Sequence, residues 1–146
     1  MSGELASRAI AYGSADYALE LELRDRLLRR PLGLRLADED LSTEGGDWHI
    51  GAFLDGKLAG VLVLTRRDGE TVRMRQVCVD KKEQGRGIGA RLVRFAEELA
   101  RARGIARITL NARKTAAGFY EKLGYRAAGD EFLEMGIPHR KMVKDL

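Results

Sequence analysis

Cysteine, histidine, proline and tryptophan are all scarce in this sequence. Its 146 residues include one cysteine, two histidines, two prolines and one tryptophan. The single cysteine, Cys78, excludes an internal disulfide and a cysteine-based metal site. The two histidines, His49 and His139, lie far apart and have no metal-ligand spacing around them. The sequence therefore gives no reason to expect a metal ion.

Long apolar runs are also missing. The longest, Leu58 to Leu64, is too short to span a bilayer. The N-terminal segment has no apolar stretch of the length that a secretory signal needs. Apolar residues make up 45% and charged residues 33% of the chain, an ordinary globular composition. We therefore expect a cytoplasmic protein without membrane partners, folded as one domain over residues 1–146.

The formal net charge of +4 is spread along the chain. Basic and acidic residues alternate, as they do over residues 20–26, whereas a nucleic-acid footprint is normally clustered. No stretch combines aromatic and basic residues into a stacking platform for bases. We therefore expect no nucleic-acid partner, although the basic excess would also suit a small polyanionic cofactor.

The first half of the chain predicts a strand, a helix and a three-stranded meander. A strand over Ala6–Tyr12 precedes a helix that Ser14 or Asp16 caps and that Pro31 ends, with an inner face of leucines at 19, 23, 27 and 28. Two-residue turn signals, Asp-Gly at 55–56 and at 68–69, join three strands into an antiparallel meander: His49–Leu54, Lys57–Thr65 and Thr71–Val79.

The second half predicts helices alternating with strands. An amphipathic helix follows residue 84, with Glu97 on its solvent face, and ends at Gly104. A parallel crossover then leads to further elements, namely a strand at Ala106–Asn111, a helix at Ala116–Leu123 capped by Thr115, and strands at Tyr125–Ala128 and His139–Lys144. The predicted fold is a mixed α/β sheet of six to seven strands with helices on both faces.

A glycine-rich loop separates the meander from the long helix. Glycines at 85, 87 and 89 remove side chains where backbone N–H groups at the positive end of a helix have no intrahelical partner. Such a loop can bind a pyrophosphate, and Arg86 could reach a further phosphate. A P-loop is excluded because its signature is missing. A Rossmann site is disfavoured because the strand at 107–111 carries no acidic residue for a ribose.

Two blocks of this sequence resemble the GNAT acetyltransferase family. Gln84-x-x-Gly87-x-Gly89 is similar to the family's Q/R-x-x-G-x-G/A signature. The segment Asn111-Ala-Arg-Lys-Thr-Ala-Ala-Gly-Phe-Tyr-Glu-Lys-Leu-Gly-Tyr125 resembles its N-x(n)-A-x-x-F-Y-E-K-L-G-Y/F motif. The two blocks stand in the family's order, one helix and one strand apart, and the strand at 73–79 resembles the family's fourth strand.

This resemblance implies acetyl-CoA as co-substrate and a sheet whose fourth and fifth strands separate to admit its pantetheine arm. The fourth strand would polarise the thioester carbonyl through its backbone, and the glycine loop would bind the pyrophosphate. By the same resemblance Asn111 would lie near the pantetheine and Lys122 near the phosphates. The residues expected at the cofactor are Val77, Cys78, Val79, Gln84, Gly85, Arg86, Gly87, Ile88, Gly89, Ala90, Asn111, Phe119, Tyr120 and Lys122.

Tyr120 is the expected general acid. The resemblance gives this role to the tyrosine of the F-Y-E-K-L-G block, and a phenol, which titrates near pH 10, is protonated at neutral pH. The alternative is that Tyr120 has only a structural role, as a helix aromatic residue that packs beside Phe119. Cys78, between two valines and without a histidine beside it, is expected to be a buried apolar residue rather than a nucleophile.

The general base stays open at this point. Some family members use a glutamate early in the fourth strand, where this chain has Arg73 and Arg75. Glu134 and His139 are candidates because the chain could return there toward the acceptor, and histidine is a common proton acceptor in catalysis. A histidine with a structural hydrogen bond, or deprotonation through ordered water, is equally compatible with the sequence.

The sequence thus predicts an N-acetyltransferase that acts on a primary amine. The acceptor, a small molecule or a peptide, is not identified, and a homodimer is possible. Two alternatives remain: a catalytically weak, CoA-binding regulatory domain of the same fold, which would not need Tyr120, and a nucleic-acid-binding module.

Overall fold

A computed structural model of the chain describes residues 4–146, so the first three residues of the predicted domain lie outside the described range. The chain packs as two compact units. The first consists of the chain up to Thr65 together with residues 76–96, and the second consists of residues 66–75 and 97–146.

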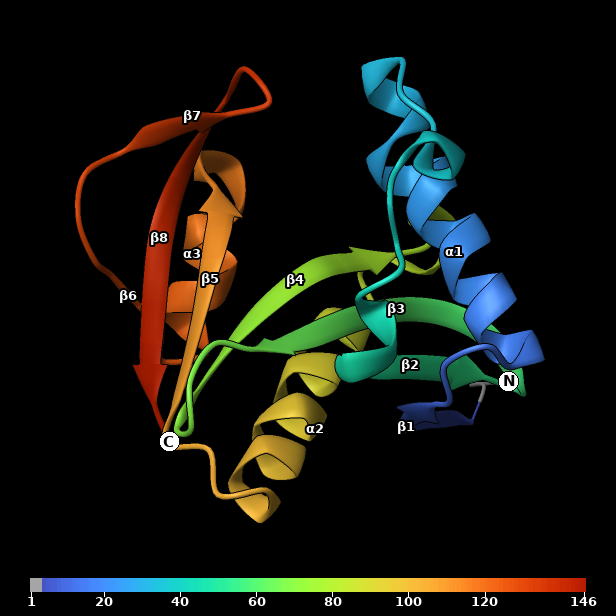
Figure 1. The fold of residues 1–146 in the computed structure, drawn as a ribbon, viewed down its shortest axis with the longest axis horizontal. Helices are drawn as coiled ribbons and strands as arrows, with labels where there is room; N and C mark the ends of the chain where they lie inside the picture. The colour runs from blue at the N-terminus through green and yellow to red at the C-terminus, as the bar shows by residue number, and fades with distance from the viewer. Residues whose placement is uncertain (1–3) are drawn as a thin grey trace. The chain divides into compact units, whose positions relative to one another are not determined.

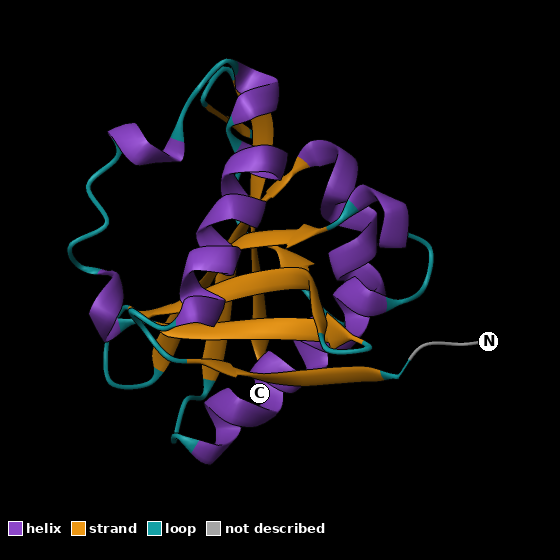
Figure 2. Ribbon diagram, turned by 90° about the vertical axis from the view of Figure 1, so that its right-hand side faces the viewer, coloured by secondary structure: helices purple, strands orange, loops and turns teal. Residues whose placement is uncertain are grey.

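The first unit is built on an antiparallel sheet. β1 (Leu5–Ile10) pairs with β2 (Trp48–Leu54), and β2 pairs with β3 (Lys57–Arg66). The turn between β2 and β3 has φ of 52° at Asp55 and 80° at Gly56, the left-handed geometry that a two-residue hairpin requires. Figure 2 shows these strands side by side, with the long N-terminal helix in front of them. The predicted hairpin is therefore confirmed.

That helix, α1 (Ala15–Leu28), begins where expected, and three leucines of its predicted inner face, at 23, 27 and 28, pack in the core. Ser14 caps it, because its Oγ accepts a hydrogen bond from the N–H of Tyr17 at 3.2 Å. Leu19, predicted to face the core, is 53% exposed, whereas Glu20 and Arg24 are fully buried. The inner stripe follows Tyr17, Glu20, Leu23 and Arg24, since these positions share one helix face.

The core of the first unit lies between α1 and the sheet. It contains residues from α1, the strands and the end of the fourth strand, namely Ile10, Tyr17, Leu23, Phe53, Val61 and Cys78. On the other side of β3, a Cβ at Gly60 would lie 3.0 Å from Leu92 Cδ1 of the second helix and 3.1 Å from the carbonyl oxygen of Cys78. Helices therefore cover both faces of this sheet (Figure 1).

The segment between α1 and β2 consists of short 3₁₀ turns joined by loops. They are η1 (Arg30–Leu32), η2 (Leu36–Asp38) and η3 (Glu44–Gly46). Asp25 of α1 holds this segment, because its carboxylate accepts hydrogen bonds from the N–H of Leu36 and from Arg30 Nε, both at 2.8 Å. The loop or short helix predicted over residues 31–47 is thus a tethered series of turns.

The second unit contains the parallel part of the fold. The first half of β4 (Thr71–Val79) pairs in parallel with β5 (Arg107–Arg113), so the predicted crossover is confirmed. β5 pairs antiparallel with β8 (Ile137–Asp145), and β8 also pairs with β6 (Arg126–Ala127) and with β7 (Phe132–Glu134). The β4–β5 ladder ends at Met74 and Leu110, although β5 continues to Arg113.

Two helices, each preceded by a 3₁₀ turn, connect further strands. After η4 (Lys81–Glu83), α2 (Ile88–Ala102) follows the glycine loop, and η5 (Lys114–Ala116) leads into α3 (Ala117–Lys122). Thr115 was predicted to cap α3, but the residue at the cap is Ala116 and it forms no side-chain hydrogen bond. The chain enters α3 directly from a 3₁₀ turn, so the helix starts without the expected cap.

The prediction of Glu97 on the solvent face of α2 is wrong. Glu97 is buried and accepts hydrogen bonds from Tyr125 Oη at 2.9 Å and from Lys144 Nζ at 3.1 Å. Its helical neighbours Val93 and Ala100 are buried as well, which places Glu97 on the inner face.

The mixed α/β class predicted from the sequence is confirmed. The described residues form eight strands and three α-helices, against six to seven strands predicted, because the three-residue β7 was not anticipated. None of the helices formed by residues 4–146 combines the length and the apolarity that a membrane span needs.

Candidate functional site

At the end of β4, Cys78 has a buried side chain and stands between two half-buried valines. Cys78 points into the α1 core, where burial raises the pKa of its thiol to about 12. Val77 and Val79 are half-buried, in keeping with strand alternation. Such a thiol stays protonated at neutral pH, so Cys78 is a core residue and not an activated nucleophile.

The glycine loop adopts the conformation that its residues permit. Gly85 and Gly87 have φ of 86° and 74°, in the left-handed region that glycine enters freely. A Cβ built at either position would meet no heavy atom within 4 Å, so the loop is open on the side where side chains are missing. Ile88 begins α2, and its first-turn N–H groups have no intrahelical acceptor. This loop can accept an anion at the helix N-terminus.

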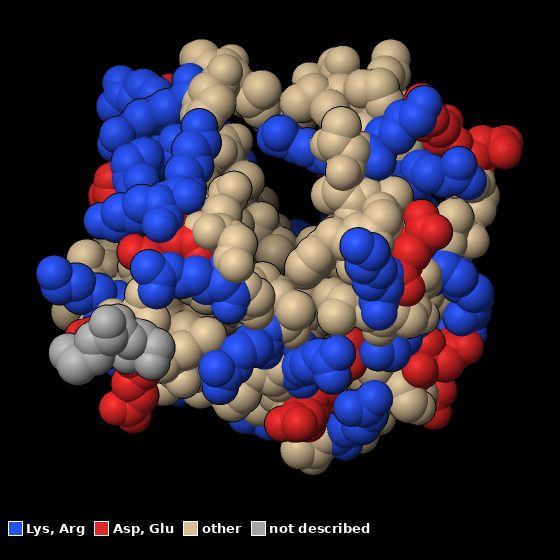
Figure 3. Space-filling view, turned by 180° about the vertical axis from the view of Figure 1, so that it is seen from behind, with Lys and Arg blue, Asp and Glu red and all other residues tan. Residues whose placement is uncertain are grey.

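Two side chains of the loop are already engaged. Gln84 Nε2 donates to the carbonyl oxygen of Val79 at 3.2 Å, which ties the loop to the end of β4. Arg86 Nε lies 3.2 Å from Glu83 Oε2, so part of its charge is compensated. Lys81 and Lys82 are exposed just before the loop. Figure 3 shows Lys and Arg side chains gathered at one upper corner of the face drawn, while elsewhere acidic side chains are interspersed.

Tyr120 is a buried phenol on α3. Its ring packs edge-to-face on Phe119 and Tyr125, with centroids 4.9 and 5.8 Å away. Burial raises the pKa of Tyr120 to about 12. Within residues 4–146 no hydrogen-bond partner is found for its Oη, whereas the buried Tyr125 Oη donates to Glu97. Tyr120 therefore carries a proton that no neighbouring acceptor uses.

The second unit also brings together Glu134 and His139, the two base candidates. His139 Nε2 lies 3.4 Å from Glu134 Oε2, and Asn111 Nδ2 donates to Glu134 Oε1 at 3.3 Å. His139 Nδ1 lies 2.7 Å from the carbonyl oxygen of Ile137, which can only accept, so Nδ1 carries a hydrogen. Arg73 Nη2 is 3.7 Å from Glu134 Oε1. The side chain of Glu134 is 39% exposed and that of His139 is 8% exposed.

Two other residues predicted at the cofactor are more exposed than Tyr120. Phe119 is 38% exposed, and Lys122 is exposed at the end of α3. The predicted residues thus form two groups, each inside one unit. The first unit holds residues 77–79 and 84–90, and the second holds Asn111, Phe119, Tyr120, Lys122, Glu134 and His139.

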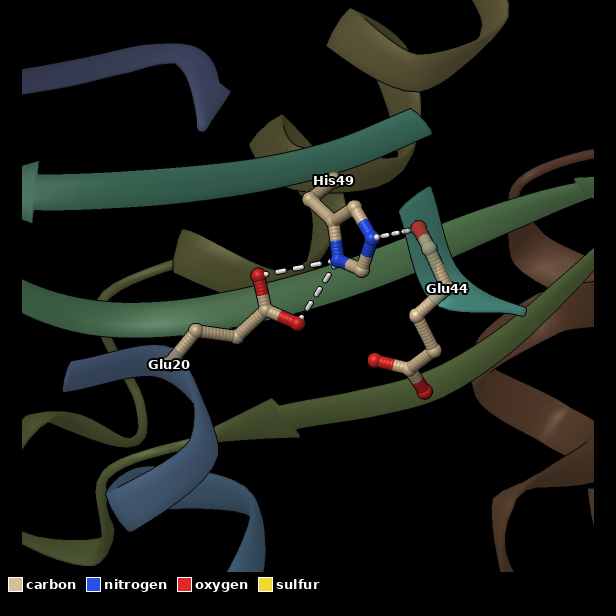
Figure 4. A group of neighbouring side chains, drawn as sticks. All are labelled: Glu20, Glu44 and His49. Atoms are coloured by element: carbon tan, nitrogen blue, oxygen red, sulfur yellow. Dashed lines mark hydrogen bonds and ion pairs between the residues drawn. The ribbon is translucent and has the colours of Figure 1, made fainter. Parts of the chain in front are cut away.

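A buried charged cluster in the first unit was not anticipated. Figure 4 shows Glu20 from α1, Glu44 from η3 and His49 from β2 pointing toward one another. Arg24 donates to Glu20 at 2.9 Å and to both oxygens of Glu44 at 2.8 and 2.7 Å. His49 Nδ1 lies 2.8 Å from Glu20 Oε2, and its Nε2 lies 2.8 Å from the carbonyl oxygen of Glu44. Both ring nitrogens face acceptors, so this geometry favours a protonated imidazole.

The ligand atoms of Glu20, Glu44 and His49 lie within 4.8 Å of one another, a spacing that a metal ion could also use. The guanidinium of Arg24 already bonds both carboxylates, however, and compensates their charge. The cluster is therefore explained as a hydrogen-bonded ion network. The sequence contained a signal for it, because Glu20 and Arg24 share the helix face of Tyr17 and Leu23.

Comparison with known proteins identifies the family. Residues 34–146 match the family model described as "Acetyltransferase (GNAT) domain". A Bacillus subtilis (strain 168) protein, provisionally named an acetyltransferase, is 34% identical over 132 residues, covering 88% of this chain and 89% of its own length.

Solved structures agree with this assignment. A provisionally named N-acetyltransferase from Lactobacillus plantarum has a TM-score of 0.87 at 26% identity, covering 97% of this chain and 98% of its own. A GNAT family acetyltransferase from Elizabethkingia anophelis with acetyl-CoA bound has a TM-score of 0.72 at 19% identity and shares the fold, with 97% and 98% coverage. The chain belongs to the GNAT family of acetyl-CoA-dependent N-acetyltransferases.

Proposed function

We propose that this enzyme transfers an acetyl group from acetyl-CoA directly to a primary amine, with Tyr120 protonating the departing thiolate. The observation that carries the proposal is the protonated phenol of Tyr120, which is 7% exposed and whose pKa is raised by burial. The nearby phenol of Tyr125, by contrast, donates its hydrogen to Glu97 at 2.9 Å and is engaged within the fold.

The glycine loop fits the diphosphate of acetyl-CoA. Residues 85–90 would hold it through the N–H groups at the start of α2, and the open side of Gly85 and Gly87 leaves room for phosphate oxygens. The structure of the Elizabethkingia anophelis relative holds acetyl-CoA, which supports the same ligand here. When bound, acetyl-CoA supplies a thioester whose carbonyl carbon the amine attacks and whose thiolate leaves.

The backbone of β4 after Gln76 would donate an N–H to the thioester oxygen, where negative charge develops during the attack. A donor aimed at such an oxygen is worth about 3–4 kcal/mol in comparable enzymes. Tyr120 would then give its proton to the thiolate sulfur. Burial raises the pKa of the phenol and keeps it protonated, so its proton is available when the thiolate leaves.

Glu134 is the proposed acceptor of the amine proton, and His139 its positioning partner. The carboxylate is partly exposed and can meet an amine, whereas His139 is buried behind it and donates through Nδ1 to Ile137. Asn111 and Arg73 contact the other carboxylate oxygen and would orient it. A water molecule between Glu134 and the amine would serve the same route.

The test is the Tyr120→Phe variant. We expect kcat to fall about 10²–10⁴-fold, because an acid that protonates the leaving group contributes this much. The dissociation constant for acetyl-CoA, measured by calorimetry, should stay within about twofold, because the phenol contacts the leaving sulfur and not the phosphates. Tyr12→Phe, the same substitution at an exposed tyrosine outside the proposed site, is the matched control and should keep most of kcat. Unchanged turnover in Tyr120→Phe would remove the phenol from the mechanism.

The acceptor is best found by measuring thiol release from acetyl-CoA over a panel of small amines, amino acids and lysine peptides. If the protein binds CoA but releases no thiol with any amine, the alternative function, a CoA-binding regulatory domain, is favoured. The cytoplasmic location, the possible homodimer, the single-domain organisation and the absence of nucleic-acid binding stay predictions.

A further inference from the structure

Gln76 has an unusual backbone conformation for its place in the chain. Among residues 4–146, three non-glycine residues have positive φ, and two of them, Asp55 and Met135, lie in hairpin turns beside Gly56 and Gly136. Gln76, with φ of 58°, instead lies inside strand β4. A residue with a Cβ holds this conformation only where surrounding contacts impose it, so the neighbours of Gln76 need an explanation.

Arg29 supplies such a contact. Its Nη2 donates to Gln76 Oε1 at 3.3 Å, and the same guanidinium donates to the Leu28 carbonyl oxygen and to both oxygens of Glu39. Arg29 itself is buried. A guanidinium held by a carboxylate is a rigid donor, because its planar fork fixes the direction of the remaining N–H groups. Gln76 is therefore held by a preorganised arginine at the C-terminus of α1.

The far end of the same strand segment is held from α1 as well. Asp80 follows β4, accepts a hydrogen bond from Arg26 Nη2 at 3.1 Å, and donates its N–H to the carbonyl oxygen of Ala59 at 2.8 Å. Residues 77–79 thus lie between two contacts that the last turn of α1 and the following residue provide. Because Glu39 belongs to the segment between α1 and β2, Arg29 also connects that segment to β4.

We infer that Arg29 is a positioning residue of the acetyl transfer: it keeps Gln76 in the left-handed conformation that turns one backbone N–H of residues 77–79 toward the thioester. This inference rests on the proposed function of β4. It assigns the segment that follows η2 a role in catalysis, since a movement of Glu39 changes the geometry of Arg29 and hence that of the β4 backbone.

The first experiment compares Arg29→Lys with the wild-type enzyme. Lysine keeps the charge but lacks the planar fork through which Arg29 bonds both oxygens of Glu39 and donates to Gln76. We expect kcat to fall about tenfold or more, as small misplacements of catalytic groups do, with the dissociation constant for acetyl-CoA within about twofold. Arg30→Lys is the matched control, because the exposed Arg30 contacts Asp25 and not β4, and it should keep wild-type kcat. An equal kcat loss in both variants would overturn the inference.

The second experiment uses Gln76→Gly, since glycine adopts positive φ without a Cβ. If Arg29 acts through Gln76, then Arg29→Lys should lower kcat by less than about twofold in the Gln76→Gly background, a clear departure from additivity. If the two substitutions instead multiply their effects, Arg29 acts elsewhere and the inference is wrong.

A readout without activity separates this inference from the proposed function. Amide hydrogen exchange of residues 76–79 should become about tenfold faster in Arg29→Lys than in the wild type and Arg30→Lys. Local opening of β4 is easier when the guanidinium of Arg29 no longer bonds Gln76. Unchanged exchange would overturn the inference even in an active enzyme. Failure of the wild type to transfer acetyl groups would instead contradict the proposed function. Faster exchange in Arg29→Lys would still support the role of Arg29 in holding Gln76.

Discussion

The two units each contain a cluster made of a histidine, an arginine and glutamate, and the clusters differ in burial. In the first unit, the side chains of Glu20 and His49 are 0% and 1% exposed, and Arg24 bonds both carboxylates. In the second, Glu134 is 39% exposed beside the buried His139, and Arg73 is 3.7 Å away. The same residue types are closed off from solvent in one place and accessible in the other.

This difference in exposure distinguishes a cluster that stabilises the fold from one that can take part in catalysis. A buried cluster whose carboxylates are already bonded to Arg24 and His49 can hold segments together but cannot meet a substrate. Glu44 in particular ties the segment before β2 to α1 and to His49. A partly exposed carboxylate, oriented by Asn111 and His139, can accept a proton from a molecule that arrives from solvent. We therefore expect the first cluster to control stability and the second to control turnover.

The largest expected effect is that of Arg24→Met on stability. Removal of the guanidinium leaves Glu20 and Glu44 buried without their partner, which costs about 3–5 kcal/mol of unfolding free energy. Urea unfolding measures it. Arg30→Met, an exposed arginine that contacts Asp25, should cost about 1 kcal/mol or less. Equal losses in the two variants would show that burial does not distinguish these ion pairs.

The next effect is that of Glu134→Gln on turnover. If Glu134 takes the amine proton, kcat should fall about 100-fold, while the unfolding free energy changes by less than about 1 kcal/mol. Glu131→Gln is the control, because Glu131 is equally exposed and contacts Lys114 at 3.3 Å. A loss of stability without a loss of turnover in Glu134→Gln would make the second cluster structural like the first.

The smallest expected effect is a pH dependence of stability that comes from His49. Burial alone lowers the pKa of His49, but hydrogen bonds to Glu20 and to the Glu44 carbonyl, with the charges of both carboxylates, raise it above 6.5. A raised pKa stabilises the folded state fully below pH 6.5, and this contribution is lost as the pH rises through the folded-state pKa. The slope cannot exceed about 1.4 kcal/mol per pH unit for one proton.

Urea unfolding at several pH values, for the wild type and His49→Gln, checks this prediction. The stability difference between the two proteins should be constant below pH 6.5 and shrink above it. Arg24, Glu20 and Glu44 are present in both proteins, so their own titration largely cancels. A difference that does not vary with pH would mean that His49 is neutral in the folded protein.

Local patterns predicted the elements well and the burial of polar residues poorly. The limits of β4, the Asp55–Gly56 turn and the parallel crossover follow from neighbouring residues, and all three were predicted. Glu97 was placed on the solvent face because charge indicates exposure on average. Its burial depends on Tyr125 and Lys144, which are distant in the sequence.

The candidate site also combines features that local patterns predict with features that depend on the folded chain. The glycine spacing and the block around Tyr120 led to a prediction of the residues that bind acetyl-CoA and donate a proton, and these roles stay proposals. The neighbourhood of Glu134 and His139 was not predictable, because β7 is only three residues long and its Met135–Gly136 turn is not a typical hairpin dipeptide.

What the sequence alone determined was local: where most helices and strands lie, where glycine permits a positive φ, and which family these patterns match. Only the tertiary structure decided which charges are buried, which carboxylate stays accessible, and that Gln76 adopts a glycine-like conformation beside Arg29. The physical reason is that backbone conformation depends mainly on adjacent residues. Burial and hydrogen bonding depend on groups that meet only after the chain has folded, such as Glu20, Glu44 and His49.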